Sequence, residues 1–339
     1  MIDAVPLSNN PLFHSFFTSQ QWFGFFSEFV NHSQQNFSLE LTPEHDIAFF
    51  SCAGNSKYSA KMLNSMTNYY SPIFGLADQP LSKCPDQQTV KQQKEAFSKF
   101  DFINVVPLFL EQANNWKNAF EQIGFRGFIY QHSVNWYETN ISNLDDFWQR
   151  RPSKLINTLK RKQDLMRKQS GFTIRIYNEG NQEQLMQALI DYHQVYYHSW
   201  KRSEPTPAFI DSICQFCWSN QALRIGVIYF ENKPIAAQIW FVYKDTAKIF
   251  KLAYHTDYNR FSPGTVLTAA LMDYVINQDK VQNIDFLTGN DEYKKDWMSE
   301  KRYLYGLQLC NKTTIRGQIG AAINNLSRFK TLTKNQQQD

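Results

Sequence analysis

The stretch that decides the fold is residues 246–299, which contains YHTDYNRFSPGTVL at 254–267 and DFLTGNDEYKKDW at 285–297. Its pattern predicts a strand up to His255, a polar loop, a helix that begins at Pro263-Gly264, and a second strand. The first amide groups of a helix have no partner inside it, and glycine lets a ligand approach the backbone, so this helix start is suited to binding phosphate. The alternative interpretation is an ordinary helix start, where proline and glycine are common.

The residues on either side predict an α/β protein with a mixed sheet. After a strand at 172–177 and helices between 181 and 219, three strands follow with short polar connections, which is typical of an antiparallel meander. The first part of the chain shows a related alternation, with an aromatic helix at 12–31 and a strand-like stretch at 65–76, although no sequence identity between the halves is visible. We expect two halves, at residues 1–144 and 145–312, and then a helix and polar tail at 313–339.

Composition excludes several classes of protein. The 339 residues are 42% hydrophobic and 19% charged, which is enough for a large core and too apolar for bulk disorder. A net charge of +4 is too small to indicate a nucleic-acid partner, and no apolar run approaches the ~18 residues of a membrane span. The N-terminus lacks the pattern of a signal peptide, and the five cysteines form no disulfide framework, so we expect a cytoplasmic protein.

Familiar catalytic and metal-binding motifs are missing from the sequence. It has no G-x-x-x-x-G-K-[ST] loop, no G-x-G-x-x-G, no H-E-x-x-H and no G-x-S-x-G. Cys214-x-x-Cys217 lies in a helical stretch without a second pair of ligands, and His193 and His198 point to different sides of a helix. We therefore expect no metal, and neither a nucleotide-hydrolysing site nor a serine hydrolase.

A basic segment precedes the second half. Between Arg150 and Arg175 there are nine lysines or arginines and one acid, Asp164. The apolar stripe of this segment predicts an amphipathic helix, so the charges are either its solvated face or a docking surface for an anionic substrate. The stripe is Leu155, Leu159 and Met166, and the candidate docking residues are Lys160, Arg161, Arg167 and Lys168.

These motifs together resemble the acyltransferases of the GNAT superfamily, in the branch of the CelD-like cellulose-biosynthesis acetyltransferases and the FemAB peptidyltransferases. That branch combines a Y-x-x-x-x-P-G-x-x-L loop and helix with an fD-f-x-x-G-x-x-x-Y-K stretch. The resemblance covers about residues 145–310 and includes the basic helix and Ser199-Trp200-Lys201. The residues that match the two motifs are Tyr258, Pro263, Gly264, Leu267, Asp285, Gly289, Tyr293, Lys294 and Trp297.

The resemblance implies two GNAT-like acyl-CoA N-acyltransferase units, the first degenerate and the second active. It implies transfer of an acyl group, in the first instance acetyl, from acyl-CoA or an acyl carrier protein to an amine or hydroxyl of a small-molecule, sugar or peptide acceptor, without metal or DNA. The loop departs from the usual R/Q-x-x-G-x-G/A signature, because it has one glycine and a proline that lacks an amide donor. Two alternatives stay open: an aminoacyl-tRNA-dependent peptidyltransferase and a non-catalytic binding module.

The resemblance also suggests sets of site residues. In this fold two parallel strands separate at their ends and the thioester lies between them, so a titratable group nearby is needed to move the acceptor's proton. In the alternative interpretation, Asp285 supports the strand end, Tyr293 and Trp200 pack, and Lys294 lies on a solvated helix face. The catalytic candidates are His255, Asp285 and Tyr293; those for the donor are Tyr254, Ser262, Pro263, Gly264, Thr265 and Lys294; those for the substrate are Trp200, Lys201, Lys160 and Arg161.

Overall fold

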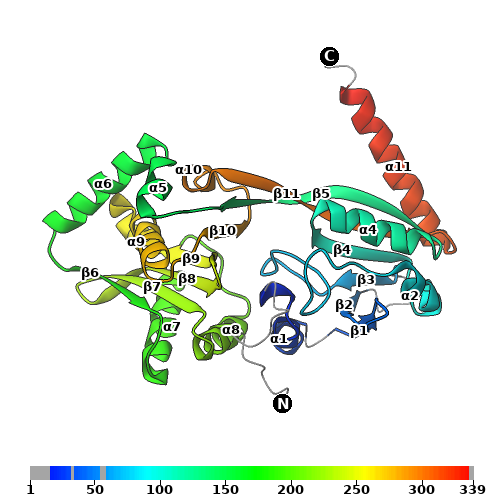
Figure 1. The fold of residues 1–339 in the computed structure, drawn as a ribbon, viewed down its shortest axis with the longest axis horizontal. Helices are drawn as coiled ribbons and strands as arrows, with labels where there is room; N and C mark the ends of the chain where they lie inside the picture. The colour runs from blue at the N-terminus through cyan, green and yellow to red at the C-terminus, as the bar shows by residue number, and fades with distance from the viewer. Residues whose placement is uncertain (1–15, 32–33, 54–58, 336–339) are drawn as a thin grey trace. The chain divides into compact units, whose positions relative to one another are not determined.

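The computed structural model describes residues 16–31, 34–53 and 59–335. The chain forms two compact units (Figure 1): unit 1 contains Met1–Ser133 and Tyr303–Asp339, and unit 2 contains Val134–Arg302. The first residues of the predicted opening helix and the last residues of the polar tail lie outside the described part of the chain. The mixed α/β architecture expected from the sequence is confirmed.

Unit 1 is built on neighbouring strands in the order β1-β2-β3-β4-β11-β5. β3 and β4 are parallel, whereas β1–β2, β2–β3 and β4–β11 are antiparallel. The last strand of the chain therefore pairs in unit 1, although the sequence analysis placed it in the second half. The strands are β1 (Asn36–Glu40), β2 (Ile47–Ala53), β3 (Met62–Ser65), β4 (Phe102–Leu108), β5 (Phe125–Glu138) and β11 (Glu300–Asn311).

Aromatic side chains fill the core of unit 1. Ser19 caps helix α1 by accepting a hydrogen bond from the Trp22 amide at 3.0 Å, and the Trp22 ring packs edge-on against Phe17 with centroids 4.9 Å apart. Because this cap begins a new helix, the opening segment forms short pieces instead of one helix. The helical elements of unit 1 are η2 (Phe16–Thr18), α1 (Gln20–Phe25), η3 (Phe26–Val30), α2 (Gln87–Gln92), α3 (Lys94–Ser98), α4 (Leu110–Glu121) and α11 (Ile315–Asn335).

Two local predictions in unit 1 were wrong. Residues 66–76, which were expected to be strand, form bends and turns after β3. The short helices α2 and α3 were not expected, since their sequence, QQTVKQQKEAFS, is mostly polar and buries only Val90 and Phe97. Tertiary packing of those two side chains outweighs the weak local pattern.

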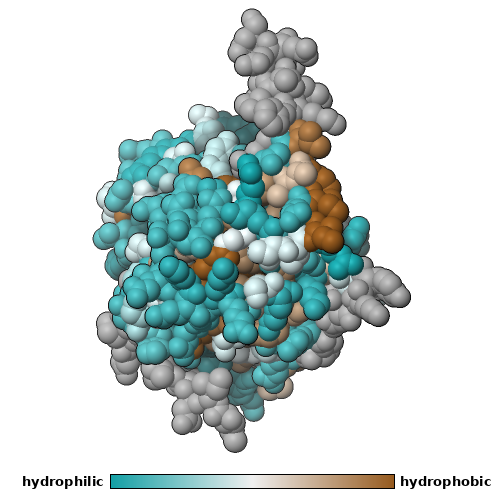
Figure 2. Space-filling model, turned by 90° about the vertical axis from the view of Figure 1, so that its right-hand side faces the viewer, coloured by the Kyte–Doolittle hydropathy of each residue, from teal (hydrophilic) through white to brown (hydrophobic). Residues whose placement is uncertain are grey.

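Helix α11 exposes large apolar side chains on one side. Ile315, Ile319 and Leu326 are all exposed, Ile315 to 77%. Figure 2 shows a strip of hydrophobic surface on a face that is otherwise mostly hydrophilic. Within the described residues, no helix combines the length and hydropathy that crossing a membrane requires.

Unit 2 has the strand order β5-β10-β9-β8-β7-β6, in which only the β9–β10 pairing is parallel among the described residues. The antiparallel meander predicted for three of these strands, β7, β8 and β9, is confirmed. Its remaining strands are β6 (Phe172–Tyr177), β7 (Leu223–Phe230), β8 (Lys233–Tyr243), β9 (Thr246–Tyr254) and β10 (Asn283–Thr288). Its helices are α5 (Leu144–Gln149), α6 (Ser153–Lys168), α7 (Gln182–Tyr197), α8 (Pro207–Ser219), η4 (Thr256–Phe261), α9 (Pro263–Asn277) and α10 (Lys294–Trp297).

Helix α9 is fixed to the sheet by apolar packing and by one buried amide. Leu267 and Leu271 are fully buried in a core that includes Trp240 of β8. The buried Gln238 side chain donates to the Gly264 carbonyl at 3.1 Å and to the Thr268 hydroxyl at 2.8 Å, and it accepts from the Trp240 indole at 2.9 Å. These bonds satisfy a buried amide and set the position of the helix start against β8.

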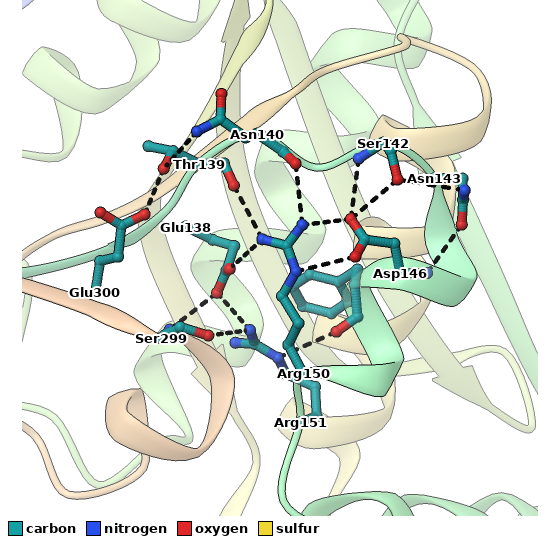
Figure 3. A network of polar contacts seen from close by, with 11 residues as sticks. Glu138, Thr139, Asn140, Ser142, Asn143, Asp146, Arg150, Arg151, Ser299 and Glu300 are labelled. Atoms are coloured by element: carbon teal, nitrogen blue, oxygen red, sulfur yellow. Dashed lines mark hydrogen bonds and ion pairs between the residues drawn. The ribbon is translucent and has the colours of Figure 1, made fainter.

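A buried ion-pair network holds the end of β5 (Figure 3). The Glu138 carboxylate accepts hydrogen bonds from Arg151 and from the Ser299 amide at 2.9 Å, and it also pairs with Arg150 at 2.9 Å. Both Arg151 and Glu138 are almost completely buried. Two of the nine bases counted in the basic segment are therefore structural and do not belong to a docking surface. The buried stripe predicted for α6 is confirmed.

Candidate functional site

The parallel strands β9 and β10 separate after a short paired region. They pair only at their first residues, up to Lys248 and Asp285. A bulge at Phe250 then shifts the register of β9 against β8, and β10 continues along β5 with a second irregularity. We call residues 249–254 and 286–288, where the two strands no longer pair, the strand fork. The separation that the family resemblance implies is thus present.

Asp285 maintains the irregularity in β10. Leu287 has a φ of 52°, a conformation that is rare for a branched side chain. One Asp285 oxygen accepts from the Leu287 amide at 2.7 Å and from the Asn135 amide group at 2.6 Å, and the other pairs with Arg302 at 3.0 Å. Asn135 also donates to the Leu287 carbonyl at 3.0 Å. Both carboxylate oxygens are therefore engaged, one with the backbone amide of Leu287 and the Asn135 side chain and the other with the Arg302 side chain, which agrees with the alternative interpretation of Asp285.

Helix α9 begins at Pro263, as predicted. Ser262 adopts a left-handed conformation with φ 48°, no side chain caps the helix within the described residues, and its first turn contains no acid. Gly264 is buried, and a Cβ atom there would lie 3.0 Å from the Tyr254 ring. The amides of Gly264 and Thr265 precede the first intrahelical bond, which runs from Val266 to Ser262. Amides of this kind, without a partner in the helix, are what anion binding at a helix start uses.

Tyr254, Trp200 and Lys201, which were predicted separately, lie together. The Trp200 ring is 53% exposed and packs on the Tyr254 ring with centroids 4.5 Å apart. The Lys201 ammonium lies 5.6 Å from the centre of the Trp200 ring and 5.7 Å from that of Tyr196 in α7. The rings therefore form a continuous surface from the start of α9 to Lys201.

The pKa of Lys201 is lowered to about 8. Burial is the main cause, and the positive charge of Lys251 adds to it, while Glu204 and Asp291 act in the opposite direction. Lys251 itself is bound to Glu204 at 2.8 Å. Tyr196, Glu204 and Lys251 were not identified from the sequence, because nothing in their local pattern separates them from ordinary helix, loop and strand residues.

His255 is buried at the end of β9. Its Nδ1 atom accepts from the Asp257 amide at 3.3 Å, and its ring stacks on His198 with centroids 4.8 Å apart. Burial, and then the charge of Lys233, lower the pKa of this imidazole. His255 therefore caps η4 as a neutral ring at pH 7, a structural use that the sequence did not suggest.

Tyr293 and Lys294 follow β10 and differ in exposure. Tyr293 is 39% exposed, and desolvation together with the charge of Asp291 raises the pKa of its phenol. Lys294 is buried, and its ammonium group donates to the carbonyls of Phe286 and Thr288 at 2.9 and 2.8 Å. Burial lowers the pKa of Lys294. It is neither on a solvated face nor open to a phosphate group, and it fixes the end of β10.

Lys160 and Arg161 are exposed on α6, and no contact joins them to the fork or to α9's first turn within the part of the chain that the structure describes. Their assignment as substrate-binding residues stays a prediction. No group of three metal-ligating side chains occurs among the described residues.

Part of the chain matches a known family of protein domains. Residues 153–295 match the family described as an acetyltransferase (GNAT) domain. A comparison of the sequence with curated proteins finds no match.

Similar solved structures extend over nearly the whole chain. FemX is 8% identical, with 94% of this chain and 96% of that chain covered and a TM-score of 0.58. A conserved protein of unknown function from Bacteroides thetaiotaomicron is 10% identical, with coverages of 91% and 98% and a TM-score of 0.55. The C-terminal domain of a putative lysylphosphatidylglycerol synthetase from Agrobacterium fabrum is 12% identical, with coverages of 85% and 87% and a TM-score of 0.51.

The sequence resemblance and these matches agree on the fold, and the match of residues 153–295 covers α6, the strand fork and the start of α9. Residues 153–295 of this chain are similar to the GNAT acetyltransferase domain family.

Proposed function

We propose that unit 2 is an acyltransferase that moves an acyl group, acetyl in the simplest case, from a thioester donor such as acyl-CoA to an amine or hydroxyl acceptor. The observation that carries the proposal is the strand fork, which leads to an uncapped helix start. Separated parallel strands leave backbone amides of β9 without a partner strand, and such amides can polarise a thioester carbonyl. The family of residues 153–295 supports the same reaction class.

The donor would lie along the fork. Its phosphate groups would accept hydrogen bonds from the amides of Gly264 and Thr265, and Tyr254 and Ser262 would border them. Tyr293 is protonated at neutral pH, as a phenol normally is, so its hydroxyl can donate a hydrogen bond to the leaving thiolate, although its raised pKa makes it a weak acid. Asp285 and Lys294 would act as positioning residues, since each holds the backbone of β10.

An alternative donor is favoured by the α9 start itself. Pro263 has no amide hydrogen and the loop has one glycine, so fewer donors face a pyrophosphate than in a glycine-rich loop. An aminoacyl-tRNA carries its acyl group as an ester and does not need this loop to bind a pyrophosphate. It would be the donor of a FemAB-like peptidyltransferase. An acyl carrier protein would likewise present its thioester on a single phosphate.

Binding and thiol release test the proposal. We expect acetyl-CoA to raise the melting temperature and to release free CoA thiol when primary amines are added. Gly264→Val should abolish the shift, because its Cβ would press on the Tyr254 ring and its methyl groups would cover the helix start.

Gly24→Val in α1 is the matched control, since no described atom lies within 4 Å of the added Cβ. Longer acyl-CoAs, acyl carrier protein and aminoacyl-tRNA distinguish the donors. If none of these binds, or if Gly264→Val binds as the wild type does, the proposed function is wrong and unit 2 is a binding module of another kind.

A further inference from the structure

Among the described residues, the side-chain amine of Lys201 has no hydrogen-bond acceptor or carboxylate within bonding distance. Two nearby lysines, by contrast, each have such partners. Lys251 is bound to Glu204 at 2.8 Å. Lys294 donates to two carbonyl groups at 2.9 and 2.8 Å. Lys251 and Lys294 are buried and are paired as lysines withdrawn from water normally are, whereas Lys201 is only partly buried. The structure therefore gives Lys251 and Lys294 a structural use and leaves the Lys201 amine without one.

The surroundings of this amine connect both sides of the strand fork. Its aromatic neighbours, Tyr196 and Trp200, continue through Tyr254 to the start of α9. Charged groups act on it from each neighbouring element: Lys251 from β9, Glu204 from the α7–α8 connection, and Asp291 and Lys294 from the segment after β10. Ring contacts thus link Lys201 through Trp200 to Tyr254 at the end of β9, and the charges of Asp291 and Lys294, which follow β10, act on its amine.

The same surroundings make the neutral amine accessible near neutral pH. Burial and the charge of Lys251 hold the pKa at about 8, so about one-tenth of the amine is unprotonated at pH 7. His255 and Asp285 are poorer proton acceptors, because the His255 Nδ1 atom already accepts a backbone amide and both Asp285 oxygens are occupied.

We propose that the Lys201 amine is the general base of the site and takes the proton from the acceptor nitrogen as that nitrogen attacks the thioester. The inference rests on the proposed function. A C–N bond forms, the C–S bond breaks, and one proton passes from the acceptor nitrogen to Lys201 Nζ. The thiolate leaves with a hydrogen bond from the Tyr293 phenol and takes its proton from water. Lys201 then releases its proton to the hydroxide so formed, and the enzyme returns to its starting state.

The first experiment measures the amine itself. The full-length protein is labelled with trace acetic anhydride between pH 6 and 11, and the modified peptides are quantified by mass spectrometry. Lys201 should titrate with a midpoint near 8, and the exposed Lys312 serves as the reference. Bound CoA should slow the labelling of Lys201 and leave Lys312 unchanged. A midpoint equal to that of Lys312 would overturn the proposal whether or not acetyl-CoA is turned over.

The second experiment measures the proton transfer. With acetyl-CoA and ethanolamine, glucosamine or a lysine-containing tripeptide as probes, Lys201→Met should lower kcat at pH 7 by about 10²–10⁴-fold with little change in the KM for acetyl-CoA. The ascending limb near pH 8 should vanish from its pH profile. Lys201→Arg keeps the charge but cannot accept a proton at this pH, so it should be as inactive as the methionine variant.

The outcomes separate the two proposals. Recovery of activity in Lys201→Arg would mean that the charge alone matters, and an unchanged pH profile in Lys201→Met would mean that another group is the base; either result overturns the inference and leaves the acyltransferase intact. If the wild type neither binds nor cleaves acetyl-CoA and CoA does not protect Lys201, the thioester donor and the base role both fail, even with a low labelling midpoint. Circular dichroism and melting temperature confirm that each variant is folded.

Discussion

Each unit contains a parallel strand pair, and the two pairs differ in what happens where the pairing stops. In unit 1, β3 and β4 pair up to Asn64 and Asn104. The Ser65 hydroxyl then accepts from the Val106 amide at 3.0 Å and donates to the Val106 carbonyl at 2.9 Å, so side chain and backbone bridge the strands. In unit 2 the pairing of β9 and β10 stops at Lys248 and Asp285, and the strands separate into the fork.

The helices that follow differ in the same sense. Asp86 caps α2 in unit 1, where its carboxylate accepts from the Thr89 amide at 2.8 Å. The start of α9 in unit 2 has a left-handed Ser262 and no side-chain cap within the described residues. Unit 1 thus uses its own side chains for the hydrogen bonds that a ligand would make in unit 2. This difference is a physical reason to expect that the first half is degenerate.

The separated strands β9 and β10 need support from neighbouring residues. Removing that support should cause the largest loss of stability. Glu138→Gln leaves the buried Arg151 without its carboxylate at the end of β5, the strand on which β10 lies. Loss of one partner of a buried pair costs about 3–5 kcal/mol in the free energy of unfolding. Chemical denaturation should show this loss, whereas the exposed Asp145→Asn should change stability by a few tenths of a kcal/mol.

The same pair predicts a dependence on pH. Burial opposes ionisation of Glu138, but Arg151 and the Ser299 amide outweigh it and hold the pKa of the carboxyl below its usual 4.5. The stabilisation is therefore complete above pH 4.5 and is lost as the pH falls through the lower value of the folded state. Glu138→Gln should remove this part of the acid sensitivity. If the variant unfolds in acid as the wild type does, Glu138 is not the group responsible.

The bridge in unit 1 can be removed. Ser65→Ala takes the acceptor from the Val106 amide, which should cost about 1–3 kcal/mol of stability. The exposed Ser98→Ala is the control and should have almost no effect. We expect no acyl-CoA binding to appear in unit 1 of Ser65→Ala, because Asp86 still caps α2. A second equivalent of CoA in calorimetry would contradict the comparison of the two units.

The cap in unit 1 can also be transferred to unit 2. Ser262→Asp would place a carboxylate at the start of α9, as Asp86 does for α2, and aspartate tolerates the left-handed conformation. We expect the affinity for acetyl-CoA to fall at least tenfold, about 1.4 kcal/mol, with no loss of stability. Ser262→Asn supplies the same cap without the charge and separates the two causes. Unchanged affinity in both variants would remove the α9 start from the donor site.

The smallest expected effect concerns the exposed bases of α6. Reversing Lys160, Arg161, Arg167 and Lys168 to glutamate should change stability by tenths of a kcal/mol, because all four are exposed and, among the described residues, Arg167 forms only an exposed pair with Asp164 at 3.2 Å. If these residues bind an anionic substrate, the variant should bind acetyl-CoA or acceptor more weakly at low salt, and the difference should shrink as salt screens it. If the variant and the wild type have equal affinity at low salt, these four bases only form the solvated face of α6.

The sequence predicted the parts of the fold that have strong local patterns. The predictions of the β7–β9 meander and of the start of α9 were correct. Alternation of apolar and polar residues and the Pro-Gly pair are local signals, which do not depend on distant parts of the chain. The return of β11 to unit 1 could not be predicted, since strand pairing depends on residues about 200 positions away. Within the site, the sequence named Lys201 and Tyr254 but gave no sign that Lys294 is buried, because a lysine's partners are set by tertiary packing.

The return of β11 has a consequence for biosynthesis. β4 has been made well before the residues that pair with it, Tyr305–Cys310, leave the ribosome. At 5–20 residues per second, the delay is on the order of ten seconds or more. During that interval the nascent chain presents an unfinished sheet edge, which other chains can join. Expression yield should therefore depend on how quickly translation proceeds from β4 to β11, and on chaperones that occupy this edge until then.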